Sequence, residues 1–315
     1  MSVSRFAPIA LFTYRRITHL ERVLAALSAC PEFAASRIFA FSDGPKGDAV
    51  SAEVAKVRDF LKAQQLPNMT IIEAPTNRGL AASIMAGVTQ LCDEFGRVIV
   101  VEDDLILTPC TLTWFNSALE KYKYDSEVWQ ISAHQFSVPE FFTRKNGLFL
   151  HLTTSWGWAT WKRAWDRYDP KAVGWERLKF DAALARDFDI GGTYPYARML
   201  IDQMEGRVDS WAIRWWWSVF REGGMALFPP RSLLQNIGNE VTATHTRYRL
   251  LKRLIPHSSL NRNVSSADKS RTLLLERCPR LPSDIGVTFD DTRAVECALR
   301  ASRRFHNRFR SAWFG

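Results

Sequence analysis

The sequence lacks a long apolar run, a pair of closely spaced cysteines and a glycine-rich phosphate-binding loop. No stretch approaches the roughly 20 apolar residues that cross a bilayer. The first apolar run, Ala7–Phe12, is too short for the core of a signal peptide. The five cysteines are scattered without a C-x-x-C pair, which argues against a disulfide framework or a zinc cage. These absences predict a cytosolic protein.

Motifs for several common enzyme classes are also missing. The sequence contains neither G-x-x-x-x-G-K-S/T nor G-x-G-x-x-G, so P-loop ATP hydrolysis and dinucleotide redox chemistry lack their motifs. No grouping of Cys with His, or of Ser with His and Asp, stands out as a nucleophile pair. A covalent mechanism is therefore not indicated.

The composition is that of a folded globular protein, with 46% hydrophobic and 24% charged residues. The net charge is +9, but residues 247–315 hold 15 Lys and Arg against 6 Asp and Glu, which leaves 27 of each sign in residues 1–246. This asymmetry predicts a basic extension and argues against a nucleic-acid-binding core. Arg293–Trp313 is predicted to be an amphipathic, arginine-rich helix. That helix either lies on anionic lipid at the inner face of the plasma membrane or packs on the rest of the protein.

Short β-rich runs alternate with helical patterns through the first 130 residues. The expected elements are Pro8–Thr13, His19–Ala29, Arg37–Phe41, Val50–Gln64, Met69–Glu73, Gly79–Glu94 and Arg97–Glu102. This alternation predicts an α/β fold with a mostly parallel central sheet flanked by helices, in which ligands bind beyond the carboxyl ends of the strands. Nine of the 12 tryptophans fall between Trp156 and Trp217, in a section expected to be mixed α+β. We therefore divide the chain into residues 1–130, 131–246 and 247–315.

Three consecutive acids, Glu102, Asp103 and Asp104, follow the four β-formers of Val98–Val101. Burying three unpaired carboxylates would be prohibitive, so we expect them at the rim of the sheet, where one can ligate Mg²⁺ or Mn²⁺. Alternate residues of a strand point to opposite sides, so Glu102 and Asp104 share a direction and Asp103 faces away. A solvated acidic turn that caps the next helix is the alternative.

Two further strand ends carry polar residues. Asp43 ends the second strand and could accept a hydrogen bond from a base or a ribose, although an ordinary Asp-Gly turn explains it as well. The third strand runs into Asn77-Arg78-Gly79 before a helix of small residues. Gly79 would let that helix N-terminus approach a diphosphate, with Arg78 beside it, although a routine helix cap is also possible. The three strand ends converge on a site for a nucleotide and a metal ion.

Several short motifs follow one another in a characteristic order. They are Val100–Leu105 (V-V-E-D-D-L), Pro109, Trp114-Phe115, Trp129–Ala133 (W-x-x-S-A), Ser155–Trp158, Asp209–Trp211, Pro230–Ser232, Asn236–Gly238 and Thr244–Thr246. With Pro8–Leu27 and Phe41–Gly44, this order resembles GT-A glycosyltransferases, in particular the N-acetylglucosaminyltransferase I group and bacterial family 2-like sugar transferases. The resemblance implies a GT-A (nucleotide-diphospho-sugar transferase) fold with a C-terminal α+β acceptor section.

The resemblance also implies roles for the acids. Asp104 would ligate the metal directly, Asp103 would hold the ribose and Glu102 would face the donor sugar. Asp43 would contact the uracil. Asp209 would be the general base that takes the proton from the acceptor hydroxyl, which gives inversion. The sequence departs from the family here, because a serine follows Asp209 where the family has a second acid.

Other site residues are expected from their positions. Glu205 is the nearest substitute for Asp209 as the base. Thr13 and Arg15, after the first strand, together with Arg78 are the further expected nucleotide contacts. His245 is expected to bind the metal or the diphosphate, or only to order a loop that closes over the nucleotide.

The tryptophans are expected to form mostly core. Trp158, Trp161 and Trp165 follow the i, i+3, i+7 spacing of a helical core stripe, and at least one ring among Trp215-Trp216-Trp217 is expected to be exposed. One tryptophan is expected to face a sugar acceptor, with Trp211 as the best candidate because it lies next to the expected base.

The combined interpretation is an inverting, metal-dependent glycosyltransferase with Mn²⁺ or Mg²⁺. It would transfer a sugar from a UDP-sugar, with UDP-GlcNAc as one candidate, to a saccharide or lipid-linked saccharide in cell-surface polysaccharide or glycolipid assembly. Two alternatives remain. One is a non-catalytic carbohydrate- or nucleotide-binding protein on the same scaffold. The other is a sugar-nucleotide pyrophosphorylase, disfavoured because no glycine-rich loop follows Pro8–Thr13.

Overall fold

The computed structural model describes residues 5–136 and 146–238. The first half contains β1 (Ile9–Thr13), α1 (Ile17–Ser28), η1 (Phe33–Ala35), β2 (Ile38–Ser42), η2 (Asp48–Val50), α2 (Ser51–Ala63), β3 (Met69–Glu73), α3 (Leu80–Phe95), β4 (Arg97–Glu102), β5 (Leu105–Leu107) and α4 (Thr111–Lys121). The strands and helices up to β4 follow the expected alternation, which confirms the α/β fold class. The residues of β1, β2 and β4 are mostly buried, whereas those of β3 are half-buried or exposed.

The second half is mixed, as expected. It contains β6 (Val128–Ser132), β7 (Leu148–Leu150), β8 (Trp158–Trp161), α5 (Lys162–Trp165), η4 (Trp175–Lys179), α6 (Ala182–Phe188), α7 (Tyr196–Met204), α8 (Trp211–Arg221), β9 (Met225–Phe228) and β10 (Leu234–Asn236). The expectation of one helical stripe through Trp158, Trp161 and Trp165 is wrong, because the first two lie in a strand. A short apolar run of this kind fits either period, and pairing with β4 and β6 decides for the strand.

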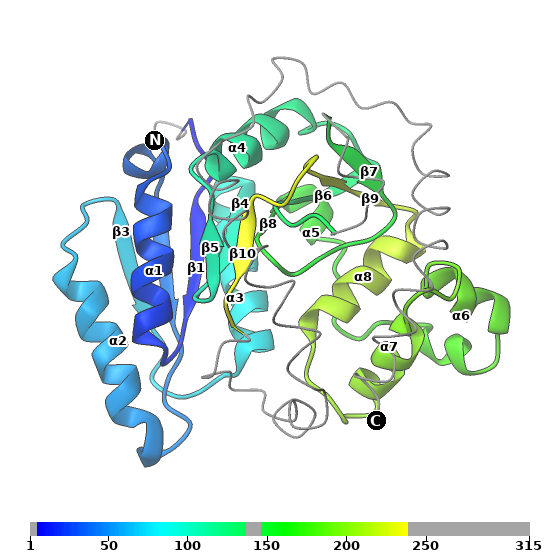
Figure 1. Cartoon of the computed structure of the whole chain (residues 1–315). Coiled ribbons are helices and arrows are strands. Elements are labelled where there is room, and N and C mark those ends of the chain that lie inside the picture. Colours follow the sequence, from blue (N-terminus) through cyan, green and yellow to red (C-terminus); the bar gives the residue numbers. More distant parts are fainter. Residues whose placement is uncertain (1–4, 137–145, 239–315) are drawn as a thin grey trace, which may run out of the picture.

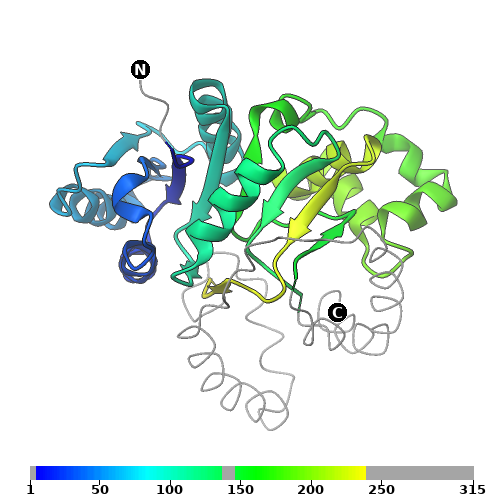
Figure 2. The same cartoon turned by 90° about the horizontal axis from the view of Figure 1, so that it is seen from above.

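One eight-stranded sheet joins the two halves in the order β3-β2-β1-β4-β8-β6-β9-β7. The strands β3, β2, β1 and β4 are parallel, whereas β8 runs antiparallel to both of its neighbours. The helices α6, α7 and α8 gather at one side of the molecule, away from α1 and α2 (Figure 1). Seen from above, the blue N-terminal helices and the green-to-yellow helices lie at opposite ends (Figure 2).

The alternation of side chains along the strands separates two apolar layers. Ile9 and Leu11 of β1 belong to a buried cluster that includes residues of α1, α2 and α4. Ala10 and Phe12 of the same strand belong to a second cluster with residues of α3, α5, α6, α7 and α8. Each face of the sheet is therefore covered by helices, as a mostly parallel sheet requires.

The tryptophans of the second half form a buried stack. Trp158 stacks on Trp211, with ring centroids 5.1 Å apart and an interplanar angle of 25°. Trp215, Trp216 and Trp217 are only 1–2% exposed, so the expectation that one of them faces solvent is wrong. The reason is that α8 is covered on more than one side, since Trp216 stacks on Phe188 of α6 while Trp215 reaches the sheet side.

A two-stranded antiparallel sheet connects distant parts of the chain. In it, β5 pairs with β10, with Leu105 opposite Asn236 and Leu107 opposite Leu234. Because β5 starts directly after the Glu102–Asp104 turn, this pairing places residues 234–238 beside the acids. The end of the second half is therefore part of the edge at which the first-half strands end.

Parts of the expected organisation fall outside the described residues. They are the extension 247–315, its amphipathic helix Arg293–Trp313, and the motif Thr244–Thr246. Within residues 5–136 and 146–238, no helix combines the length and the apolar character needed to cross a membrane.

We predict that Gly87→Val destabilises the protein because α3 approaches the sheet closely at this glycine. A Cβ atom at Gly87 would lie 2.8 Å from a ring carbon of Phe12 and 3.0 Å from one of Phe41. Urea denaturation should show a loss of about 1–3 kcal/mol in the free energy of unfolding. The control Ala86→Val, at an exposed position of the same helix, should cost only a few tenths of a kcal/mol, roughly its helix propensity. Equal losses in the two variants would contradict the close approach.

Candidate functional site

The parallel register brings the carboxyl ends of three strands to one level. Thr13 of β1 lies opposite Ser42 of β2, and Phe12 lies opposite Glu102 of β4. Asp43 and the turn at Asp103 therefore emerge at the same edge of the sheet. This is the arrangement that the sequence predicted.

A cavity of about 200 Å³ lies at this edge and is lined by residues of both halves. Its lining residues are Leu80, Glu102, Asp104, Ser155, Trp156, Asp209, Ser210, Trp211, Ala212 and Asn236. Glu102 and Asp104 line the cavity together, whereas Asp103 is not among the lining residues and accepts a hydrogen bond from the backbone N–H of Tyr14 at 3.2 Å. Glu102 and Asp104 thus share the cavity, as expected, although residues 103 and 104 form a turn after β4.

The surroundings of Glu102 favour its protonated form. Burial, together with the nearby carboxylates of Asp104 and Asp103 and against a lowering by Arg16, raises the pKa of Glu102 to about 8. Glu102 therefore holds a proton near neutral pH unless an additional positive charge enters the cavity. Such a charge would favour the ionised form.

Arg16 bridges the other two acids. Its Nη2 atom donates to Asp103 Oδ1 at 2.5 Å and to Asp104 Oδ2 at 2.9 Å, and its side chain is 18% exposed. Burial opposes the charge of Arg16, but the two carboxylates outweigh that effect and raise its pKa. The sequence interpretation chose the neighbouring Arg15, which instead pairs with Glu53 at 3.3 Å. The tandem arginines after β1 are the signal that could have indicated Arg16.

The chain packs closely around Asp104. The backbone N–H of Ile237 donates to the backbone oxygen of Asp104 at 2.9 Å. The side-chain oxygen of Asn236 accepts from the backbone N–H of Gly238 at 2.8 Å. A Cβ atom at Gly238 would lie 2.3 Å from Asp104 Oδ2, so only glycine leaves this carboxylate oxygen free of a clash.

Asp43 organises the loop before α3. Its Oδ1 accepts from the backbone N–H groups of Gly44 and Arg78, both at 2.9 Å. Its Oδ2 accepts from the backbone N–H of Gly79 and from the Asn77 side chain, both at 3.0 Å. Each oxygen thus has two donors within the chain, which is the turn role that the sequence left open. A contact between Asp43 and uracil stays a prediction.

The remaining expected nucleotide contacts lie at the same edge. The Thr13 hydroxyl is buried and donates to the backbone oxygen of Phe41 at 3.4 Å. Arg78 is exposed, directly before Gly79, which has a φ of +78° and precedes α3. The left-handed conformation is one that glycine adopts readily, and it lets the first free N–H groups of α3 face this edge.

Asp209 and Glu205 occupy different environments. Asp209 lines the cavity with a side chain that is 68% exposed, and its nearest ion-pair partner is Arg214 at 4.0 Å. Glu205 pairs with Lys179 at 2.5 Å and also with Arg207, and it is not among the lining residues. Of these two candidate bases, only Asp209 faces the other carboxylates.

The aromatic side of the cavity differs from the expectation. Trp211 lines the cavity but is only 4% exposed, because it stacks on Trp158. Trp156, which the sequence interpretation did not single out, lines the cavity with 39% of its surface exposed. Its ring contacts His134 edge to face, with centroids 4.8 Å apart. Trp156 is the aromatic ring that a ligand in this cavity can reach.

The acids fit a hard divalent cation that takes part of its coordination from a ligand. Within the described ranges, no three side chains among His, Cys, Asp and Glu are grouped so as to hold a metal ion. Asp104 lines the open cavity with its carboxylate group, together with Glu102 and Asp209. Mg²⁺ is commonly bound by one or two carboxylates with substrate phosphates and water as the other ligands. His245, the other expected ligand, lies outside the described residues.

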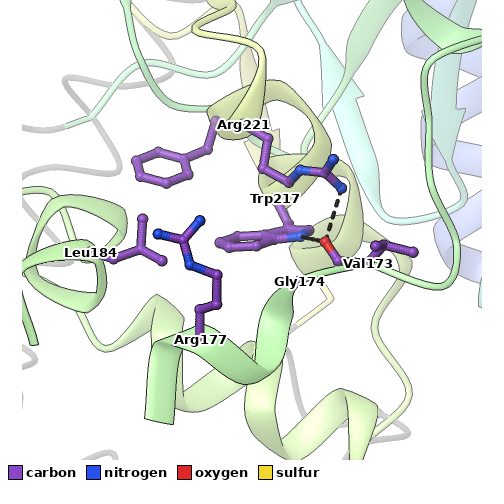
Figure 3. Close-up of a pocket in the computed structure, with 7 residues that line it drawn as sticks. Val173, Gly174, Arg177, Leu184, Trp217 and Arg221 are labelled. Atoms are coloured by element: carbon purple, nitrogen blue, oxygen red, sulfur yellow. Dashed lines mark hydrogen bonds between the residues drawn. The ribbon is translucent and has the colours of Figure 1, made fainter. Parts of the chain in front are cut away.

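A second hollow of about 350 Å³ lies near the C-terminal end of α8 (Figure 3). It is lined by Val173, Gly174, Arg177, Leu184, Trp217, Phe220 and Arg221. None of these lining residues is acidic. Both Arg221 and Trp217 donate to the backbone oxygen of Val173, at 2.9 and 3.2 Å. Of these two hollows, only the first is lined by carboxylates.

We predict that Asp43→Asn destabilises the protein by about 1–3 kcal/mol, because a carboxamide cannot accept from all four donors and leaves buried N–H groups unpaired. The measurement is urea denaturation in the absence of ligands. Asp48→Asn, at an exposed position on η2, is the matched control and should change the free energy of unfolding little. An unchanged stability of Asp43→Asn would remove its role in the loop.

We predict a loss of stability below pH 6.5 that depends on His134. Burial lowers the pKa of His134 from 6.5 to about 4, so the unfolded chain binds a proton in this range that the folded protein does not. The stability from neutral His134 is present above pH 6.5 and is lost as the pH falls towards 4, by no more than about 3 kcal/mol. The free energy of unfolding of His134→Phe, measured by urea denaturation between pH 4 and pH 7, should lack this part of the pH dependence. If the free energies of the wild type and the variant change equally with pH, the prediction is wrong.

The comparisons with known proteins find likeness only among solved structures. No protein-family model matches the sequence, and no curated protein does. A mannosyltransferase from Pyrobaculum calidifontis, PcManGT, in complex with GDP-Man and Mn²⁺, is 13% identical, with 79% of this chain and 62% of that chain covered and a TM-score of 0.42. GalNAc-T7 with UDP, GalNAc and Mn²⁺ is 9% identical, with 73% and 43% covered and a TM-score of 0.45.

The galactosyltransferase LgtC, in complex with donor and acceptor sugar analogs, is 12% identical, with 70% of this chain and 72% of that chain covered and a TM-score of 0.35. The chain thus spans less than two thirds of the length of PcManGT and of GalNAc-T7. Identities this low do not assign an activity, which has to come from the side chains of the cavity.

Proposed function

We propose that this protein is a glycosyltransferase of the GT-A type that transfers a sugar from a nucleoside diphosphate donor, with UDP as the expected nucleotide. The observation that carries the proposal is the meeting of Glu102, Asp104 and Asp209 around one cavity at the carboxyl end of the parallel strands. The ordered motifs of the sequence support the same assignment. An acceptor that is a saccharide or a lipid-linked saccharide belongs to this proposal.

The first half of the chain supplies the donor side of the cavity. The Asn77–Gly79 loop, whose N–H groups Asp43 holds, leads into α3, and the free N–H groups at the N-terminus of α3 would face an anion such as a diphosphate. Asp104 would hold Mn²⁺ or Mg²⁺, which when bound neutralises the charge of the diphosphate. Glu102, deeply placed beside it, would face the donor sugar, and Asp103 would contact the ribose.

The second half supplies the base. The exposed Asp209 carboxylate lies across the cavity from Glu102 and Asp104, where it can accept the proton of an acceptor hydroxyl. That oxygen forms a bond to the anomeric carbon as the bond to the diphosphate oxygen breaks, and the diphosphate leaves with the electron pair. Attack from the face opposite the diphosphate inverts the anomeric configuration.

Trp156 is the proposed contact for the acceptor sugar. An indole ring that is partly exposed and held by a neighbouring ring offers a flat apolar surface to the C–H face of a pyranose. Trp211 is almost fully buried, so we assign the contact with the acceptor sugar to Trp156 instead. Ser155 and Ser210, which also line the cavity, offer hydroxyl groups to the same ligand.

We predict that UDP with Mn²⁺ raises the melting temperature, because a ligand that binds only the folded state stabilises it, by about 2.7 kcal/mol at a concentration 100 times its dissociation constant. The rise should be absent with chelator and strongly reduced in Asp104→Ala. Asp209→Asn should keep the rise and lose about 10²–10⁴-fold in UDP-sugar turnover. The matched control Glu205→Gln should keep both. If turnover survives in Asp209→Asn but is lost in Glu205→Gln, Glu205 and not Asp209 is the general base. If UDP, GDP and ADP all leave the melting temperature unchanged, the proposed function is contradicted.

A further inference from the structure

The guanidinium of Arg16 contacts the same carboxylate, Asp104, that we propose as the metal ligand. The same nitrogen atom of Arg16 contacts Asp103 and Asp104, at 2.5 and 2.9 Å. All three side chains are mostly shielded from water, with exposed fractions of 18%, 7% and 16% for Arg16, Asp103 and Asp104. Poorly solvated ion pairs interact more strongly than those in open solvent.

The contact with Asp104 is in direct competition with a metal ion. Asp104 Oδ2 accepts the guanidinium N–H of Arg16, and Asp104 lines the cavity that a cation would enter. A divalent cation that binds this oxygen has to replace the Arg16 hydrogen bond. By contrast, Asp103 is not among the cavity-lining residues and keeps a second donor, the backbone N–H of Tyr14.

We propose that Arg16 is an internal counter-ion for Asp104, which a divalent cation must displace, and that the displaced guanidinium binds the anionic diphosphate of the donor. Arg16 keeps its contact with Asp103 in this exchange, so its side chain turns at the edge of the cavity without leaving it. Free cation then binds weakly to the protein alone, because it has to compete with a charge that the fold provides.

The second half of this inference rests on the proposed function, whereas the competition for Asp104 does not. A guanidinium presents several N–H donors in one plane, which suits the oxygens of a diphosphate. Arg16 directly precedes α1 and follows β1, so it lies at the strand end where a nucleotide would be bound. Arg16 thereby makes cation binding and nucleotide binding favour each other.

The first test is Mn²⁺ binding to the full chain without nucleotide, measured from the free Mn²⁺ signal by electron paramagnetic resonance. Arg16→Met should tighten Mn²⁺ binding about tenfold, because the charge-assisted hydrogen bond that competes with the ion is gone. Arg15→Met removes the same charge one residue away, where the partner is Glu53, and should change the Mn²⁺ affinity less than about twofold, since exposed charges are screened.

Arg16→Lys keeps the test decisive if Arg16→Met fails to fold, which circular dichroism and melting temperature will show. The lysine ammonium is a single point charge, so it should compete less well than the guanidinium and tighten Mn²⁺ binding by a smaller factor. Unchanged, weaker or undetectable Mn²⁺ binding in the folded variants would overturn the proposal. So would an equal tightening in Arg15→Met, since it would reflect net charge alone.

The second test is UDP binding at saturating Mn²⁺, measured by isothermal calorimetry. Arg16→Met should weaken UDP binding about tenfold, because the guanidinium contact with the diphosphate is lost. Equal UDP affinity in the wild type and Arg16→Met would overturn the role of Arg16 towards the diphosphate. If Mn²⁺ binding responds as expected while UDP binds neither protein with or without Mn²⁺, the proposed function fails and the competition for Asp104 stands.

Discussion

The arrangement of the site depends on one electrostatic constraint, the cost of placing three consecutive carboxylates at the end of a buried strand. β4 is the centre of the sheet, and its end carries Glu102, Asp103 and Asp104 into a region with little solvent. Each acid is stabilised differently. Glu102 takes up a proton, Asp103 accepts from Arg16 and from Tyr14, and Asp104 shares Arg16. The charges of the turn are thus partly compensated by the fold itself.

Most of the first half could be predicted from the sequence because its signals are local. Apolar β-runs and amphipathic helices alternate there, and the register of parallel strands follows from their burial. The shared cavity of Glu102 and Asp104 agrees with the alternation expected of a strand, although Asp104 lies in the turn after β4. Their meeting with Asp209 was expected from the family resemblance, and the structure places the three carboxylates around one cavity. The specific role of each acid remains a proposal.

Other features depend on contacts between distant residues and could not be predicted in the same way. The turn between β1 and α1 determines that Arg16 and not Arg15 contacts the acids. Residues of a turn follow no regular spacing, so the sequence does not predict their directions. The exposure of Trp156 and the burial of Trp215–Trp217 depend on how α8 is covered by α6 and the sheet. The different placement of the two candidate bases depends on the surface pairing of Glu205 with Lys179 and Arg207, which holds it away from the cavity that Asp209 lines.

The pairing of β5 with β10 also determines when the site can form. During synthesis, the chain through β4 and β5 emerges long before residues 234–238, which lie beside Asp104 in the folded protein. A nascent chain of this intermediate length contains the parallel strands β1 to β4, but domains generally fold as units. It has neither the closing strand nor Asp209, so its acidic turn is still open to water. A chain that is truncated before β10 would therefore contain the strands of the large sheet without an assembled site.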